Sequence, residues 1–244
     1  MLQFDTSLVY SIDMIKEYIK IIKTLRTEKG ISQLKIAEKL GISRISYIAI
    51  EQGKRELTLS EAQKLADIFG ITLPEMESGL APNYEKYKQM ILVYLRNAGS
   101  RDGKIPKTKL AKLLYLADFS WFYNHLESMS GMQYRKISYG PVPDIFFRAI
   151  DELEELGKIV VDRKSVGDKE MLLIGESEGN KNEKIKTLSL EENSLIKKIS
   201  AKWKYKNTNE IVNFTHNQLP FMICDENEII PYGLITQEDP DYVY

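Results

Sequence analysis

Residues 32–55, "SQLKIAEKLGISRISYIAIEQGKR", constrain the fold of this chain more than any other stretch. They contain two short runs with apolar residues at helical spacing, and a single glycine, Gly41, separates the runs. Ser32 and Ser43 stand directly before the two runs, where a hydroxyl can accept hydrogen bonds from the first free N–H groups of a helix. Glycine adopts a left-handed backbone at little cost, so Gly41 allows a tight turn. The stretch therefore predicts two short helices packed across that turn.

The flanking sequence predicts further short helices around this pair. Before it, residues 12–30 place apolar side chains on one helical face and end at a glycine. After it, residues 58–71 begin at a capping hydroxyl, from Ser60 or Thr58, and carry a second apolar stripe. Four or five short helices joined by tight turns fit the helix-turn-helix motif. The expected inner residues are Ile15, Ile19, Ile22, Leu25, Ala62, Leu65, Ala66, Phe69, Leu73 and Met76.

The same residues, with the downstream "LADIFGITLPEM", resemble the Xre/Cro-type helix-turn-helix family over about a quarter of the chain. The resemblance implies one phosphate contact at the start of the second helix, three residues near the groove and two basic residues that clamp the backbone. Helix N-termini and side-chain donors suit phosphate oxygens, and arginine can contact guanine through two hydrogen bonds. In that order, the implied DNA-binding residues are Gln33, Ser43, Arg44, Ser46, Lys54 and Arg55.

The recognition helix is more apolar than the family's usual pattern, because Ile45, Ile48 and Ala49 stand where polar or basic side chains are common. Residues 1–80 carry eleven Lys and Arg against eleven Asp and Glu, and DNA affinity scales with the phosphates that basic residues neutralise. Three implied cations nevertheless lie together, and apolar groups can contact thymine methyls. Two interpretations stay open: specific DNA binding, or a module for dimerisation or partner binding.

A short linker separates this domain from the rest of the chain. "PEMESGLAPNYEKYK" contains two prolines, a glycine and several polar residues. We expect domains at residues 1–78 and 84–244 with a linker at 79–83. The second domain opens with an amphipathic helix, "NYEKYKQMILVYLRNAG", and a polar connection, "SRDGKIPKTK". "KLAKLLYLADFSWFYNHL" then predicts a helix buried on most sides, with Asp118 among its apolar residues.

The next segment combines an extended stretch, a rigid turn, a helix and a hairpin. "QYRKISYG" is extended, and the prolines of "GPVP" exclude a regular helix or strand. Asp144 lies in the first turn of the following helix, where its charge complements the helix dipole, and Gly157 ends that helix. "KIVVDR" and "EMLLIG" predict a β-hairpin. A helix followed by a hairpin is also how a winged helix ends, so a second DNA-binding fold stays open.

The remaining residues predict two more helices and complete a second resemblance. Ser189 and Glu192 form a capping box, and "NTNEIVNFTHNQLPF" is a short helix that runs into a proline turn. The residues "KLAKLLYLADFSWF", "GMQYRKISYGPVPDIFFRAIDELEELGKI", "THNQLPF" and "IIPYGLI" resemble the Panacea family, also described as SocA-like or GepA-like. The expected fold class is mainly α with a small β component: an Xre-type helical bundle followed by an α+β Panacea domain with a helical core and a β-hairpin.

The Panacea resemblance implies an antitoxin that neutralises a co-encoded toxin by direct protein–protein binding. Aromatic side chains dominate binding hot spots because they bury a large area at low entropic cost. On the extended segment before the proline turn we expect an exposed surface, while Tyr115 and Trp121 are expected in the core. We expect Asp118 to bond a tyrosine or arginine of the same region, since a lone buried carboxylate is costly. The candidate toxin-binding residues are Tyr134, Arg135, Tyr139, Pro141, Phe122 and Tyr123.

Composition argues against several other classes of protein. The net charge of −1 gives no global attraction to nucleic acid or to a membrane. No apolar run is long enough to span a bilayer, and the N-terminus does not have the pattern of a signal peptide. A single cysteine and two histidines favour a reducing cytoplasm and argue against a metal site or a cofactor. Cys224 with His216 is a weak candidate for a nucleophile and base, because no third group orients them.

The sequence thus favours a cytoplasmic, non-enzymatic antitoxin of a type II toxin–antitoxin system. Its partners would be a cognate protein toxin and operator DNA, with no membrane contact, and the chain would form a homodimer or a hetero-oligomer with the toxin. The first domain would provide promoter autoregulation or dimerisation. Two alternatives stay open: a transcriptional repressor whose C-terminal domain senses a ligand or dimerises, and an adaptor that delivers a bound protein to a protease.

Overall fold

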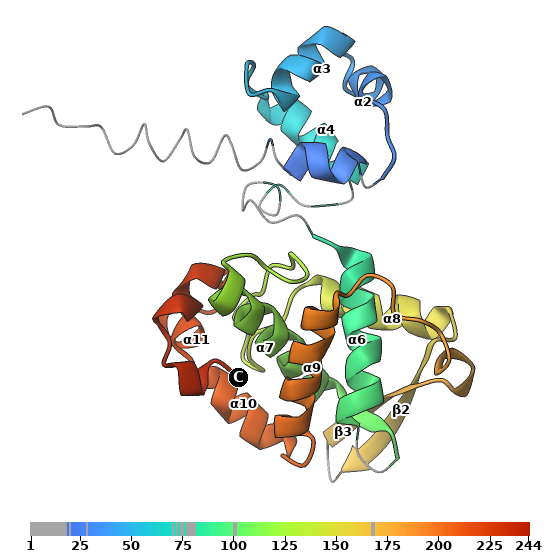
Figure 1. Cartoon of the computed structure of the whole chain (residues 1–244), viewed down its shortest axis with the longest axis vertical. Helices are drawn as coiled ribbons and strands as arrows, with labels where there is room; N and C mark the ends of the chain where they lie inside the picture. The colour runs from blue at the N-terminus through green and yellow to red at the C-terminus, as the bar shows by residue number, and fades with distance from the viewer. Residues whose placement is uncertain are drawn as a thin grey trace, which may run out of the picture. The chain divides into compact units, whose positions relative to one another are not determined.

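The computed structural model describes residues 19, 21–27, 29–69, 71, 73, 76, 82–99, 102–166 and 169–244. The chain divides into two compact units, Met1–Pro82 and Asn83–Tyr244, and each is described by itself (Figure 1). Ile15 of the first expected helix and residues 79–81 of the expected linker lie outside the described residues. The prediction of a mainly helical protein with a small β component is confirmed.

The first unit is a helical bundle around a helix-turn-helix. Residues 21–27 are helical, and the later helices are α2 (Gln33–Leu40), α3 (Arg44–Glu51) and α4 (Leu59–Phe69). The Ser32 hydroxyl accepts a hydrogen bond from the N–H of Lys35, and the Ser43 hydroxyl accepts one from the N–H of Ser46. Gly41 has φ 75° and ψ 30°, the left-handed backbone that the turn requires. The caps and the turn are therefore where the sequence predicts them.

The core of this unit is the apolar set that the helical spacing predicts. Thr58, one of the two expected caps of α4, exchanges hydrogen bonds with Glu61: the N–H of Glu61 donates to Thr58 Oγ1 (3.2 Å), and the N–H of Thr58 donates to Glu61 Oε2 (2.9 Å). Ala62 is half-buried and packs against the core. The buried members of the core are Ile21, Ile22, Leu25, Ile36, Ala37, Leu40, Tyr47, Leu65, Phe69 and Met76.

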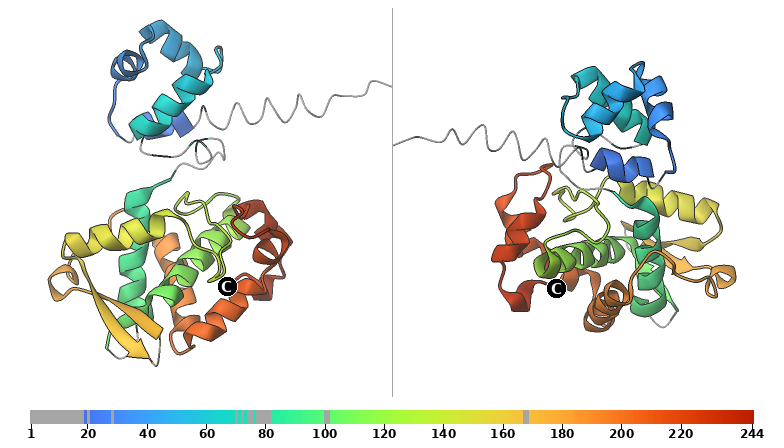
Figure 2. Two further views of the ribbon diagram at one scale, coloured as in Figure 1. Left: turned by 180° about the vertical axis from the view of Figure 1, so that it is seen from behind. Right: turned by 45° about the horizontal axis from the view of Figure 1, so that its top comes forward.

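The second unit is built on helices packed around α7, with a small sheet beside them (Figures 1 and 2). Its elements are α6 (Tyr84–Ala98), β1 (Lys104–Pro106), α7 (Lys107–His125), α8 (Ile145–Glu155), β2 (Ile159–Val166), β3 (Lys169–Glu176), η1 (Glu178–Asn180), α9 (Leu190–Trp203), α10 (Thr208–His216), α11 (Leu219–Ile223), η2 (Tyr232–Gln237) and η3 (Pro240–Tyr242). Every residue from Lys109 to Trp121 is buried, because α7 contacts α6, α9, α10 and η2 on different sides. The predicted burial of this helix is confirmed.

The sheet has three antiparallel strands in the order β1-β3-β2. β2 and β3 form the predicted hairpin, with Val161 opposite Ile174. β1 was not predicted, since "SRDGKIPKTK" was interpreted as a polar connection. In that stretch Ile105 is 1% exposed and pairs with Ile174. One buried side chain between a lysine and a proline is too short a pattern to reveal a strand from the sequence.

Helix caps also define the C-terminal part. Ser189 and Glu192 form the predicted capping box at α9, and Asn207 and Glu210 form a second one at α10 that the sequence analysis did not identify. Among the residues that the structure describes, no helix is long and apolar enough to cross a membrane.

Candidate functional site

The outer face of α3 carries several of the implied DNA-binding residues. Ser43 stands at the N-terminus of α3, and its hydroxyl lies 2.9 Å from the hydroxyl of Ser46. Arg44 and Lys54 are exposed, and Ile45 is 80% exposed. The first unit thus presents a helix N-terminus, two exposed basic side chains and one exposed isoleucine on the same helix and its exit turn.

The other implied DNA contacts, Gln33 and Arg55, are held by carboxylates of the domain itself. The amide nitrogen of Gln33 donates to Glu51 Oε2 (2.9 Å), and Nη2 of Arg55 donates to Glu61 Oε1 (2.7 Å). An amide group and a guanidinium keep further N–H donors, although Nη1 of Arg55 is buried. Each also joins one segment of the motif to another: Gln33 joins α2 to α3, and Arg55 joins the exit turn to α4.

Glu51 is the centre of a buried network that the sequence analysis missed. Arg26 binds both carboxylate oxygens of Glu51, and Tyr47 donates its hydroxyl to Oε1 at 2.8 Å. Burial alone would raise the pKa of Glu51, but the hydrogen bonds from Arg26, Gln33 and Tyr47 lower it below its usual value. A carboxylate bonded in this way fixes α3 against α2 and the preceding helical residues. Its partners lie up to 25 positions away in the sequence, so no local pattern indicates them.

In the second unit, Asp118 is the hub of a buried hydrogen-bond network. Its carboxylate accepts hydrogen bonds from the N–H and hydroxyl of Ser130 (2.7 and 2.5 Å), from the hydroxyl of Tyr134 (2.8 Å) and from the hydroxyl of Ser128 (3.2 Å). Complete burial raises the pKa of Asp118, and these donors oppose the rise. The prediction that Asp118 bonds a tyrosine of its own region is confirmed.

The expectation that Tyr134 lies on an exposed surface is wrong. Its side chain is fully buried, because its hydroxyl binds Asp118 and its ring meets Phe119 edge-on at 5.7 Å. Phe119 in turn stacks on Tyr232 at 4.4 Å, and Phe122 stacks on the same ring at 5.4 Å. An aromatic core cluster therefore contains Tyr115, Phe119, Tyr134 and Tyr232, and Tyr115 lies in the core as predicted.

The "YGPVP" turn closes over a buried lysine. Lys112 is 1% exposed, and its ammonium donates to the carbonyl of Pro141 at 3.0 Å. Burial lowers the pKa of Lys112 to about 7. Gly140 has φ 94°, and a Cβ at this position would lie 2.6 Å from Lys112 Cε and 2.7 Å from His216 Nε2. The turn therefore needs a glycine for both its backbone and its neighbours.

Pro141, a candidate toxin-binding residue, is buried in this turn. Its position follows from the packing of Lys112 beneath it, since Pro141 supplies the carbonyl that the ammonium binds. The remaining four candidates reach the surface to different degrees. Tyr139 is 74% exposed, whereas Arg135, Phe122 and Tyr123 are half-buried.

Helix α11 lies against the segment that carries Tyr139. The ring of His216 stacks on Phe221 at 4.4 Å and interacts with the backbone of Tyr139. The ammonium of Lys136 donates to the carbonyl of Cys224 at 2.7 Å and sits over the ring of Phe221. These contacts bring α11 beside residues 136–140. The exposed apolar residues of these two segments are Tyr139 (74%), Met222 (63%) and Ile223 (56%), and this set is called the Tyr139 patch below.

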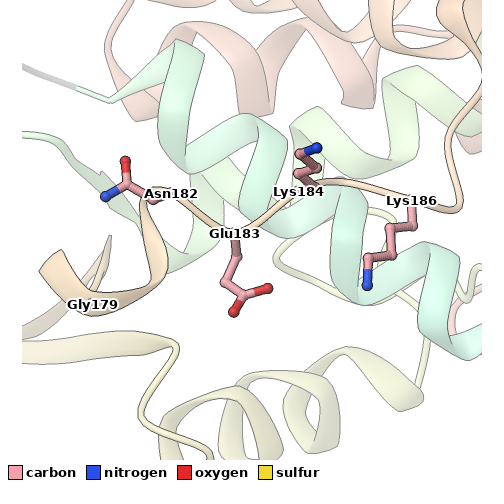
Figure 3. A pocket seen from close by; sticks show the side chains of 5 residues that line it. All are labelled: Gly179, Asn182, Glu183, Lys184 and Lys186. Atoms are coloured by element: carbon pink, nitrogen blue, oxygen red, sulfur yellow. The ribbon is translucent and has the colours of Figure 1, made fainter.

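The chemistry expected of a nucleophile or of a metal centre is not favoured in this region. Cys224 is buried, and burial raises the pKa of its thiol, which disfavours the reactive thiolate. Burial and the nearby Lys112 and Lys136 lower the pKa of His216. In the described part of the chain, no group of three or more His, Cys, Asp or Glu side chains could hold a metal ion. A hollow open to solvent near η1 is lined mainly by polar side chains (Figure 3); its residues are Gly179, Asn182, Glu183, Lys184 and Lys186.

Comparison with known families assigns both units. Residues 22–76 match the helix-turn-helix family model, and residues 110–220 match the model described as antitoxin SocA-like, Panacea domain. The fused architecture expected from the sequence is thereby confirmed. No solved structure matches the chain significantly.

Three similar curated proteins are transcriptional regulators, and each matches less than a third of this chain. The cryptic phage CTXphi transcriptional repressor RstR of Vibrio cholerae is 32% identical over 71 residues, which cover 29% of this chain and 64% of RstR. The uncharacterised HTH-type regulator MJ0272 of Methanocaldococcus jannaschii is 38% identical over 55 residues, 22% of this chain and 83% of that protein. The SPbeta prophage-derived regulator YonR of Bacillus subtilis is 36% identical over 64 residues, 26% of this chain and 59% of YonR.

Proposed function

We propose that this chain, which belongs to the proteins that fuse an Xre-type helix-turn-helix domain to a SocA-like Panacea domain, is an antitoxin. The second unit would neutralise a co-encoded protein toxin by direct binding. The first unit would provide promoter autoregulation or dimerisation. The match to the antitoxin SocA-like model over residues 110–220 supports the first part, and the similarity to RstR and the other regulators supports the second.

The observation that carries the antitoxin proposal is the construction of the Tyr139 patch. The "YGPVP" turn lies within the Panacea match and α11 begins at its C-terminal end, yet these two segments pack together over Lys112 and His216. The result is a rigid buried layer beneath large apolar side chains that face solvent. Large exposed apolar side chains on segments that pack together are typical of protein-binding surfaces. A fixed layer that holds them in place lowers the entropy lost on binding.

The residue assignment follows from burial. Tyr139 is the proposed central contact, and Arg135, Phe122 and Tyr123 are proposed at its margins. Two hydrogen bonds fix the Arg135 side chain in position, because it donates to the carbonyl of Asn227 at 2.6 Å and to the carboxylate of Asp144 at 3.2 Å. Tyr134 and Pro141 are buried, so they would support toxin binding only by packing beneath the surface and would not contact the toxin.

Growth assays with the full-length chain test this proposal. The wild-type chain should relieve growth arrest when co-expressed with the product of the neighbouring gene, and the two purified proteins should form a complex. Tyr139→Ala should weaken both effects, whereas Tyr205→Ala, which truncates a tyrosine that is 91% exposed beyond α9, should not. If the wild-type chain does not relieve the growth arrest, the antitoxin function is contradicted.

DNA-binding regulation is the second candidate function, and the exposed basic residues of the α3 region favour it. Arg44 at the start of α3 and Lys54 in its exit turn are exposed on the helix-turn-helix that resembles RstR. We place Ser43 and Ser46 beside them at the groove, with Gln33 and Arg55 at the phosphates. A mobility shift on the upstream promoter, repeated at several salt concentrations, tests this function. Specific DNA binding should weaken as salt rises, because phosphate contacts release counterions.

A further inference from the structure

The second unit contains the connectivity of a winged helix. The elements run α6, β1, α7, α8, β2, β3, and the sheet has the order β1-β3-β2 with antiparallel pairs. Figure 2 shows α8 leading into the β2–β3 hairpin. In a winged helix that reads DNA, the helix before the hairpin is the recognition helix and the hairpin is the wing. Helix α8 therefore occupies the position from which such a fold contacts its partner.

The outward face of α8 is acidic. Its buried residues, Phe146, Ala149, Ile150 and Leu153, lie on one side at helical spacing. The opposite side carries exposed carboxylates, with Asp144 just before the helix. These residues, called the α8 acidic face, are Asp144, Asp151, Glu154 and Glu155.

The chain itself neutralises only part of this charge. Glu152, at the border of the buried side, pairs with Arg148 at 2.8 Å and lies 3.4 Å from Lys88. Asp144 pairs with Arg135 at 3.2 Å. Within the described ranges, the other three carboxylates of the α8 acidic face form no ion pair.

The location of two of these carboxylates is unfavourable for the helix. Glu154 and Glu155 lie in the last turn of α8, which contains no basic residue. The helix dipole is negative at this end, so carboxylates there are destabilising. The helix dipole therefore does not favour acidic residues at these two positions, whereas a basic partner surface would be complementary to them.

Apolar side chains flank the acidic face. Phe147 is 47% exposed on the same side of α8, and Leu156 directly after the helix is 62% exposed. Val160, the second residue of β2, is 46% exposed. Apolar groups bordered by charge are typical of protein interfaces, and complementary charge directs encounter and orientation. The phosphates of DNA would meet repulsion at this face instead.

We propose that the α8 acidic face docks against a basic surface of the toxin. This inference rests on the antitoxin function proposed above and names the chemistry of the partner surface. The ion pair of Arg135 with Asp144 joins the α8 acidic face to the segment that carries Tyr139, so one partner can contact both. Association would be fast at low ionic strength and would slow as salt screens the attraction.

Charge reversal in the full-length chain tests the proposal. Glu154→Lys with Glu155→Lys should lower the association rate with the purified product of the neighbouring gene about tenfold or more, and should reduce the salt dependence of that rate. The melting temperature should stay unchanged or rise, since lysines suit the C-terminal end of a helix. Loss of binding would then not result from unfolding.

Glu127→Lys is the matched control for the single variant Glu154→Lys. Glu127 is exposed just beyond the C-terminus of α7, whereas Lys107 at the other end of α7 contacts the ring of Phe147 in α8. A helix of this length spans about 28 Å, so the control lies far from the α8 acidic face. Glu154→Lys should slow association, and Glu127→Lys should not.

Each remaining outcome overturns the proposal in a distinguishable way. If wild-type chain binds the toxin and the double variant binds it equally fast, the α8 proposal fails and the antitoxin function stands. If wild-type chain does not bind the toxin, both fail. If Glu127→Lys slows association as much as Glu154→Lys does, the effect results from the overall charge of the chain and not from the α8 acidic face. If Arg148→Ala weakens binding to promoter DNA but leaves toxin binding unchanged, α8 contacts nucleic acid and the proposal is wrong.

Discussion

Replacing Lys112 by methionine should remove a specific dependence of stability on pH. Lys112 is buried beneath the "YGPVP" turn, and its ammonium has the carbonyl of Pro141 as hydrogen-bond partner. His216 is a neighbouring titratable group, and because its pKa is lowered, its ring is uncharged above pH 7. Methionine has a similar length and no charge, so Lys112→Met keeps most of the packing while removing the buried amine.

The size of the effect follows from the pKa of Lys112, which burial lowers from 10.5 to about 7. Between these values the unfolded chain holds a proton on Lys112 and the folded chain does not. Stability therefore rises with pH across this window, by about 1.4 kcal/mol per pH unit. From pH 7 to pH 10, the free energy of unfolding of the wild-type chain should increase by about 4 kcal/mol relative to Lys112→Met. Below pH 7 the difference should be constant, with the variant the more stable protein.

Urea unfolding of both proteins at several pH values between 6 and 10 measures this difference. Lys197→Met, which removes an exposed lysine of α9, is the matched control and should show no such change relative to wild type. A difference between wild type and Lys112→Met that stays flat up to pH 10 would refute the reasoning. The amine would then be hydrated, or paired with a carboxylate, in the folded protein.

Three further substitutions test other parts of the structure. Arg44→Ala should weaken promoter binding by about 1–3 kcal/mol in a mobility shift without lowering the melting temperature; unchanged affinity would exclude a base contact. Gly140→Ala, which forces a methyl group to 2.6 Å from Lys112 Cε at φ 94°, should lower the free energy of unfolding by about 2–4 kcal/mol; a neutral result in urea unfolding would mean that the turn can rearrange. Tyr134→Phe removes one donor from Asp118 and should cost about 1.5–3 kcal/mol in the same assay; lost toxin binding at full stability would instead make Tyr134 a contact residue.

The helix-turn-helix could be predicted because its determinants are local. Ser32, Gly41 and Ser43 act on backbone groups within four residues of their own positions. The network around Glu51 could not be predicted in this way, since Arg26 and Gln33 reach it from other helical segments. What a sequence shows directly is the cap and the turn, and what it conceals is the side-chain pairing between helices.

In the second unit, one hydrogen bond accounts for a prediction that is confirmed and for another that is wrong. Asp118 was expected to bond a tyrosine or an arginine, and that expectation is correct. The bond itself buries Tyr134, so the separate expectation of an exposed Tyr134 was incompatible with it. An extended segment alternates its side chains between two faces, and only the packing partner decides which face is covered. Tyr139 faces solvent on the same segment.

The meaning of the acidic residues in α8 depends on topology in the same way. The run "IDELEELG" is visible in the sequence, and alone it predicts only a solvated helix face. The position of α8 before the hairpin matters because β1 pairs with β3, and this sheet order gives the connectivity of a winged helix. β1 is short and contains a proline, so the sequence did not indicate it.

Direct binding between the purified full-length chain and the purified product of the neighbouring gene tests the central claim most directly. Titration calorimetry should show a saturable complex whose affinity falls in Tyr139→Ala and stays unchanged in Tyr205→Ala. Absence of any complex between the two wild-type proteins, under conditions where both are folded, would contradict the antitoxin function.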